Sequence, residues 1–74
     1  MVSGKDVIRT LKKIGYTVVR TKGSHVKLKR GNRIVIVPLH DEISKGTLLS
    51  IIRQAGITKE QLIELLNDPC HEHM

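Results

Sequence analysis

Thr21-Lys22-Gly23-Ser24-His25-Val26-Lys27-Leu28-Lys29 is a turn sequence followed by a strand sequence. Glycine and serine are typical of tight turns, and the alternation of polar and aliphatic residues after Ser24 predicts an extended chain. Side chains of a strand alternate between the two faces of a sheet, so His25 shares one face with Lys27 and Lys29. Val26 and Leu28 then lie in the core on the other face. The stretch predicts a sheet whose open face carries an imidazole among ammonium groups.

Two further strands are predicted beside this one. Residues 16–21 are rich in β-branched side chains and lead into the turn. Residues 34–37 (Ile-Val-Ile-Val) follow a turn at 30–33 that contains Gly and Asn, and they end at Pro38. Three short strands with tight turns form an antiparallel meander, with the 34–37 strand at an edge. This aliphatic edge needs a cover, which a partner, a second copy or a loop of the same chain could provide.

Helices are predicted on both sides of the strand region. Apolar residues recur there at helical spacing, with hydroxyl residues before each run and Gly or Asp-Pro after it. The helices are bounded by Ser3 and Gly15, by Ser44 or Thr47 and Gly56, and by Thr58 and Asp68-Pro69. The first and last starts are capping boxes, completed by Asp6 and Gln61. The predicted fold class is α+β, a two-layer sandwich of order α-β-β-β-α-α with a three-stranded antiparallel sheet.

Length and composition describe one small domain. The chain has 74 residues, of which 39% are hydrophobic and 27% charged, as in ordinary globular proteins. We expect a single domain over residues 1–69 and a disordered tail over residues 70–74, although the Cys and His residues of this tail are types that can also bind metal. The single cysteine and the lack of a long apolar run favour a cytoplasmic protein without a membrane segment.

The positive charge is concentrated in the first part of the chain. Residues 1–40 carry ten Lys and Arg against one acidic residue, whereas residues 41–74 carry three against six. This polarity suits a polyanion on one surface, either a phosphate backbone or an acidic protein; a solvated basic face without a partner is the alternative. The chain has one aromatic residue, Tyr16, which excludes the class of single-strand binders that stack bases on aromatic platforms.

His25 is the candidate for chemistry, because histidine is the usual side chain for proton transfer near neutral pH. RNA is a plausible substrate for such a site, since its 2′-hydroxyl is an internal nucleophile that needs a base and a phosphate clamp. Lys22, Lys27 or Lys29 could hold the phosphate. The alternative is an exposed histidine that contacts phosphate or has only a structural role.

Several short motifs together resemble the HicA family of toxins. These motifs are Gly15-Tyr16, Arg20, Gly23-Ser24-His25, Val37-Pro38-Leu39-His40, Gly46-Thr47-Leu48, Ile51 and Gln54-Ala55-Gly56. The family consists of small messenger-RNA interferases of toxin–antitoxin pairs. The resemblance implies a fold like the double-stranded-RNA-binding domain, a catalytic role for His25 without metal or other cofactor, and a HicB-like antitoxin protein as partner.

The resemblance and the charge pattern together define the expected site. RNA contacts are expected at Lys22, Gly23, Ser24, Lys27, Lys29, Arg30 and Arg33. His40 is either a second proton carrier or phosphate contact, or a loop residue satisfied by local hydrogen bonds. Gly46 is expected to permit a close approach at a helix start. The predicted function is a messenger-RNA endoribonuclease toxin, and the alternative is a non-catalytic basic module that binds RNA or protein.

Overall fold

The structure is a computed structural model that describes residues 2–67. Its elements are α1 (Gly4–Lys13), β1 (Thr17–Lys22), β2 (His25–Arg30), β3 (Arg33–Pro38), α2 (Lys45–Ala55) and α3 (Lys59–Leu66). The predicted order α-β-β-β-α-α is confirmed, as is the α+β class. The expected helix end at 68–69 and the expected tail at 70–74 lie outside the described residues. No helix in the described part of the chain is long and apolar enough to cross a membrane.

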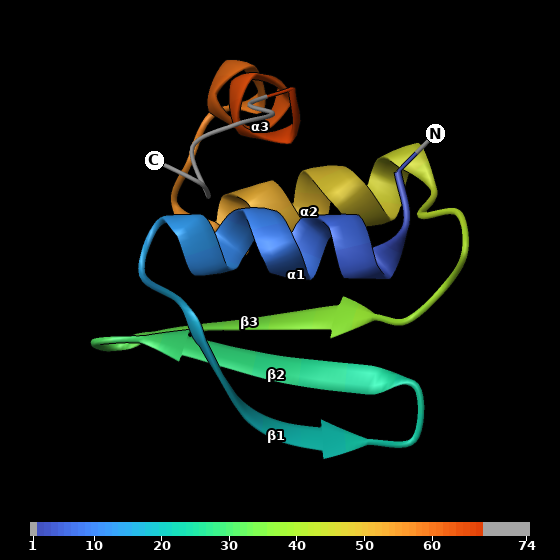
Figure 1. The fold of residues 1–74 in the computed structure, drawn as a ribbon, viewed down its shortest axis with the longest axis vertical. Helices are drawn as coiled ribbons and strands as arrows, with labels where there is room; N and C mark the ends of the chain where they lie inside the picture. The colour runs from blue at the N-terminus through green and yellow to red at the C-terminus, as the bar shows by residue number, and fades with distance from the viewer. Residues whose placement is uncertain (1, 68–74) are drawn as a thin grey trace.

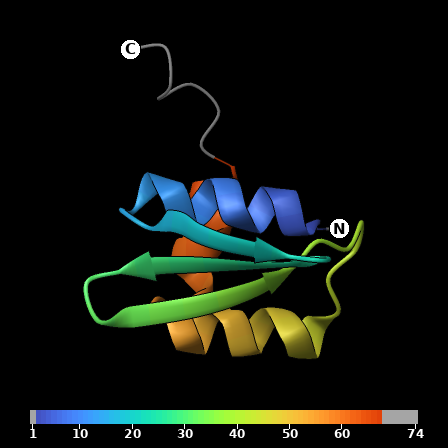
Figure 2. The same cartoon turned by 90° about the horizontal axis from the view of Figure 1, so that it is seen from below.

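The three strands form one antiparallel sheet of order β1-β2-β3, with α1 and α2 on one of its faces and α3 packed on these two helices on the same side (Figures 1 and 2). Gly23 and Gly31 turn the chain between the strands with φ of 59° and 58°, a left-handed conformation that glycine adopts without strain. The β1–β2 register shifts between Val18 and Arg20, so Val19 is the extra residue of a β-bulge. The hairpin between β2 and β3 is regular.

The core lies between the sheet and the helices. Val26 and Leu28 of β2 and Val35 and Val37 of β3 are buried, as the alternation predicted for β2. The helices contribute Val7, Leu11, Ile51, Ala55 and Leu62, and the loop after β3 contributes Ile43. This division leaves the other face of the sheet free of helices.

The helix ends follow the sequence signals. Ser3 and Asp6 form a capping box at α1, and Thr58 and Gln61 form one at α3. Bonds from Ser3 to the Asp6 carboxylate lower the pKa of this group below its ordinary value. Of the two candidates for the start of α2, Ser44 is the N-cap.

Tyr16 anchors the first strand to α2. Its buried hydroxyl donates a hydrogen bond of 2.9 Å to the carbonyl oxygen of Ala55. The guanidinium of Arg30 lies over the Tyr16 ring, 4.9 Å from its centroid. The one aromatic residue of the chain therefore packs inside the domain and does not present its ring to a ligand.

The edge of β3 is partly capped by α2. The backbone amide of Ile36 donates to the side-chain oxygen of Gln54 on α2, at 3.3 Å, and Pro38 has no amide hydrogen to offer. The sequence left a partner, a second copy or a loop of the same chain open as the cover; the structure shows one contact from α2 at Ile36, and Ile34 and Ile36 remain 44% and 38% exposed. This edge is closed to strand pairing at these two positions.

The close approach of backbone occurs at Gly4 and not at Gly46. A Cβ atom at position 4 would overlap the carbonyl oxygen of Pro38 and lie 3.0 Å from the Cα of Leu39, whereas one at position 46 would meet open space. The Gly4 amide also donates to the His40 carbonyl oxygen at 2.9 Å. At Gly46 no part of the described chain approaches the backbone, so the close approach expected there is not made within the fold.

Candidate functional site

The open face of the sheet gathers most of the cations that the sequence singled out. Strand register places His25 opposite Lys22, Lys27 opposite Arg20, and Lys29 opposite Thr17. The three β2 residues alternate with the buried Val26 and Leu28, and their partners on β1 share the face that points away from the helices. The predicted face of one imidazole among ammonium groups is therefore present on β2, and β1 adds two more cations to it.

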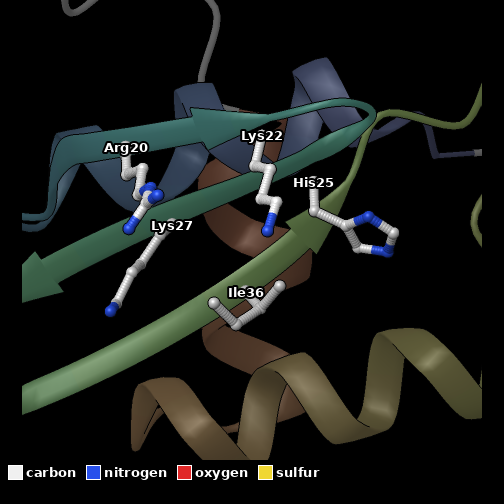
Figure 3. Close-up of a pocket in the computed structure, with 5 residues that line it drawn as sticks. All are labelled: Arg20, Lys22, His25, Lys27 and Ile36. Carbon is white, nitrogen blue, oxygen red and sulfur yellow. The ribbon is translucent and has the colours of Figure 1, made fainter.

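A hollow of about 240 Å³ lies on this face (Figure 3). It is lined by Arg20, Lys22, His25, Lys27 and Ile36, and we call it the cationic hollow. In Figure 3 the Lys22 amine lies between the imidazole of His25 on one side and the Arg20 and Lys27 groups on the other. A phosphate held at Lys22 would thus lie next to both a titratable group and further positive charge.

Backbone hydrogen bonds hold His25 in place while its side chain is free. His25 begins β2 directly after the Gly23-Ser24 turn and pairs with Lys22 on one side and Pro38 on the other. The Leu39 amide donates to the Ser24 carbonyl oxygen at 2.6 Å and ties the turn to the end of β3. The imidazole is exposed and makes no hydrogen bond with any residue in the range 2–67. The fold therefore fixes the His25 backbone and leaves the imidazole unbonded.

The cations of the open face have no acidic partner in the described part of the chain. Within residues 2–67 the one ion pair joins Arg9 and Asp6 on α1, at 2.8 Å. Arg20, Lys22, Lys27 and Lys29 form no ion pair there, so their charge is available to a ligand. Unneutralised charge on one surface raises the local concentration of anions.

Arg30 and Arg33 lie apart from the cationic hollow. Both side chains turn toward the helices, where Arg30 Nη1 donates to the Ile14 carbonyl oxygen at 2.7 Å and Arg33 Nη1 donates to the Gln54 carbonyl oxygen at 3.2 Å. These carbonyls end α1 and α2, where a cation also interacts favourably with the helix dipole. The two arginines are thus engaged in the fold, on the opposite side of the sheet from His25.

His40 lies at the same end of the sheet as His25, two residues beyond Pro38. It is exposed, and it is not among the residues that line the cationic hollow. Its backbone carbonyl accepts from the Gly4 amide, and its imidazole makes no hydrogen bond within residues 2–67. This bond joins residues 36 positions apart and is not local, so the role of His40 stays a prediction.

Arg20 and Ile36 line the hollow but were absent from the residues expected to bind RNA. A signal for both existed in the sequence. Arg20 lies two residues before Lys22 on the same strand, so alternation puts both on one face. A tight turn at Gly31-Asn32 pairs Arg30 with Arg33 and, three steps further, Lys27 with Ile36. Gly23 and Ser24 form the turn beside the hollow and do not line it.

Groups of three or more metal-ligating side chains do not occur in the described residues. The Cys and His residues of the tail, considered as metal ligands from the sequence, lie outside this part of the chain. The chemistry available in the hollow is that of an imidazole, two ammonium groups and a guanidinium.

A comparison with protein families identifies the family of this chain. The family model described as "HicA toxin of bacterial toxin-antitoxin" matches residues 4–57, which is 54 of the 74 residues. The chain belongs to the HicA toxin family. The match to HicA runs from the start of α1 to just beyond α2 and includes the whole cationic hollow. Membership means that this HicA chain acts as the toxin of a toxin–antitoxin system and has an antitoxin partner. No curated protein sequence matches it.

Proposed function

We propose that this HicA-family toxin is an endoribonuclease that cleaves messenger RNA, with His25 as the proton carrier. One observation carries the proposal: an exposed imidazole that the fold does not use lies in a hollow with three cations that have no acidic partner in the described residues. Histidine supplies proton transfer, and unpaired cations bind the phosphate on which RNA cleavage takes place.

The reaction follows from the groups present. A ring nitrogen of neutral His25 takes the proton of a ribose 2′-hydroxyl while the 2′-oxygen attacks the adjacent phosphorus. The bond from phosphorus to the 5′-oxygen breaks, and this oxygen receives a proton from the Lys22 ammonium or from water. The products are a 2′,3′-cyclic phosphate and a 5′-hydroxyl end. General acid–base help of this kind contributes roughly 10² to 10⁴ in rate.

The cations stabilise the charge that develops on the phosphate. Arg20 and Lys27 lie opposite each other on neighbouring strands, so both can reach one phosphodiester on the open face. Lys29, further along the same face of β2, is placed to contact a neighbouring phosphate. The same positive charge repels a divalent ion, which supports a mechanism without metal.

A specific observation also supports a second candidate, a non-catalytic module that binds RNA or an acidic protein. The imidazole of His25 has no hydrogen-bond partner in residues 2–67 that would fix its tautomer and orientation. Catalytic histidines usually have such a partner. In this alternative His25 contacts phosphate and the toxin acts by occupying RNA.

Two RNA strands of identical sequence separate the candidates. One is unmodified, and the other carries a 2′-O-methyl group on every ribose and so lacks the nucleophile. We expect cleavage of the first strand alone, with 2′,3′-cyclic phosphate ends detected by mass spectrometry and an unchanged rate in excess EDTA. Cleavage of the methylated strand, or loss of activity in EDTA with recovery on adding Mg²⁺, would contradict the mechanism. Binding of both strands without cleavage would favour the non-catalytic module.

A further inference from the structure

The two edges of the sheet differ. The β3 edge is capped by Gln54 at the Ile36 amide and ends in a proline. The β1 edge has no such cover: all six residues of β1 are exposed, and the strand makes substantial contacts with β2 alone among the described elements. Figure 1 shows β1 at the rim of the sheet, with no helix or strand beyond it. An exposed edge strand is a template for a strand from another chain.

The direction of the backbone groups on β1 follows from the hydrogen bond at the other edge. Ile36 and Lys27 are register partners, and the Ile36 amide points away from β2 toward Gln54. The two therefore form a non-hydrogen-bonded pair, so the amide and carbonyl of Lys27 point toward β1. On β1 their partner is Arg20. Successive residues of a strand alternate in this direction. The amide and carbonyl of Thr21 therefore point outward from β1, where the fold does not use them.

The side chains of β1 determine which strand can pair there. Val18 and Val19 are 40% and 51% exposed, an unusual state for aliphatic residues on two successive positions. Arg20 and Lys22 lie on the open face of the same strand. Charged side chains and a bulge on an edge strand disfavour pairing with an uncharged strand or with a copy of itself.

A second copy of the chain is the poorer occupant. Each chain carries a net charge of +6, and pairing two β1 strands would bring the Arg20 and Lys22 cations of both copies together. Like charges on neighbouring strands are destabilising, whereas opposite charges across a strand pair attract. A partner strand with Asp or Glu at alternate positions would instead place carboxylates beside Arg20 and Lys22, and these opposite charges attract.

We propose that the antitoxin binds by adding an acidic strand to the outer edge of β1. The inference rests on the toxin–antitoxin partnership of the family, and it does not depend on RNA cleavage. The added strand extends the sheet by one position. Its acidic side chains on the open face contact Arg20 and Lys22, two of the cations that line the cationic hollow. The same contact neutralises the phosphate-binding surface, so binding and inhibition are one event.

A proline scan of the two edges tests this proposal. The probe is an antitoxin that co-purifies with the unmodified toxin when the two are co-expressed, with the product of the adjacent reading frame tested first. Thr21→Pro removes an outward amide on the β1 edge without removing a bond to β2. Ile34→Pro is the matched control, because Ile34 is also outward by alternation but lies on the β3 edge. We expect Thr21→Pro to weaken binding at least tenfold and Ile34→Pro to leave it within twofold, with thermal melts showing that both variants are folded.

Residue-resolved hydrogen exchange gives a second measurement that needs no variant. In the complex of the unmodified chains we expect the Thr21 amide to become protected at least a hundredfold and the Ile34 amide to be unchanged. Rapid exchange at Thr21 in a saturated complex would overturn the proposal, even if Thr21→Pro had failed to fold. Protection at Ile34 in place of Thr21 would place the partner on the other edge and would overturn it as well.

Discussion

Neutralising the cationic hollow should remove most of the salt dependence of RNA binding. The perturbation is the triple variant Arg20→Gln, Lys22→Gln, Lys27→Gln. Within residues 2–67 these side chains have no acidic partner and make no hydrogen bond, so their replacement breaks no interaction of the described fold. All three lie on the open face of the sheet. A change in RNA affinity can then be assigned to the lost charges.

The magnitude follows from the number of cations on that face. With Lys29 there are four, and each phosphate contact contributes about 0.7 to the slope of log affinity against log salt for a single strand, giving about 2.8. Raising salt from about 50 to 200 mM should then weaken binding by the parent protein about 50-fold. The triple variant keeps one of the four phosphate contacts, so its slope should be about 0.7. Its affinity for RNA should then fall only about threefold over the same salt range.

Fluorescence anisotropy with a labelled, fully 2′-O-methylated RNA measures both slopes without cleavage. The control is Arg30→Gln with Arg33→Gln, which removes two charges from the helix side of the sheet, where they bond helix carbonyls. This pair should lose stability and keep the parent slope. A triple variant with the parent slope would refute the reasoning and would move RNA binding to another surface, such as the Lys5 and Lys12 side of α1.

Three predictions concern the scaffold. Gly4→Ala should lower the free energy of unfolding by about 1–3 kcal/mol in urea titrations, because its Cβ overlaps the backbone of Pro38; equal stability would show that α1 can shift freely. Tyr16→Phe should cost about 1 kcal/mol, since the Ala55 carbonyl loses its buried donor, while RNA cleavage stays at the parent rate. For Asp6 the folded pKa is lowered, so its stabilisation is complete above the ordinary value of 3.8 and is lost as pH falls through the folded pKa. Asp6→Asn should therefore lower the melting temperature near pH 6. The melting temperature of the variant should also fall less than that of the parent as the pH is lowered. The same dependence of melting temperature on pH in both proteins would contradict this.

Local sequence patterns were sufficient to predict the elements of this fold. Alternation at Val26 and Leu28, the glycines at the turns and the capping boxes at Ser3 and Thr58 all act within a few residues of the chain. The structures that these patterns form depend little on contacts with distant segments of the chain. The structure confirms each of them. The same patterns put His25 and Lys27 on one face of β2.

Features that depend on contacts between distant segments were not predictable in this way. The close approach at Gly4 depends on where the end of β3 lies, and the cover of the β3 edge depends on Gln54, 18 residues beyond Ile36. Arg30 and Arg33 resemble surface cations in the sequence, and only the placement of α1 and α2 shows that they bond helix carbonyls. The bulge at Val19 likewise has no marker in the sequence, because no glycine or proline occurs there.

The central claim, that His25 transfers the proton, is tested most directly by single-turnover cleavage of RNA by His25→Ala. The side chain is exposed and makes no hydrogen bond in the described structure, so stability should change by about 1 kcal/mol or less. The cleavage rate should fall by roughly 10² to 10⁴, which corresponds to about 3–5 kcal/mol of transition-state stabilisation, while affinity for the 2′-O-methylated RNA stays within about twofold. His40→Ala serves as the matched control and should keep at least half of the parent rate. A folded His25→Ala protein that cleaves RNA at the parent rate, or a His40→Ala protein that alone loses activity, would contradict the claim.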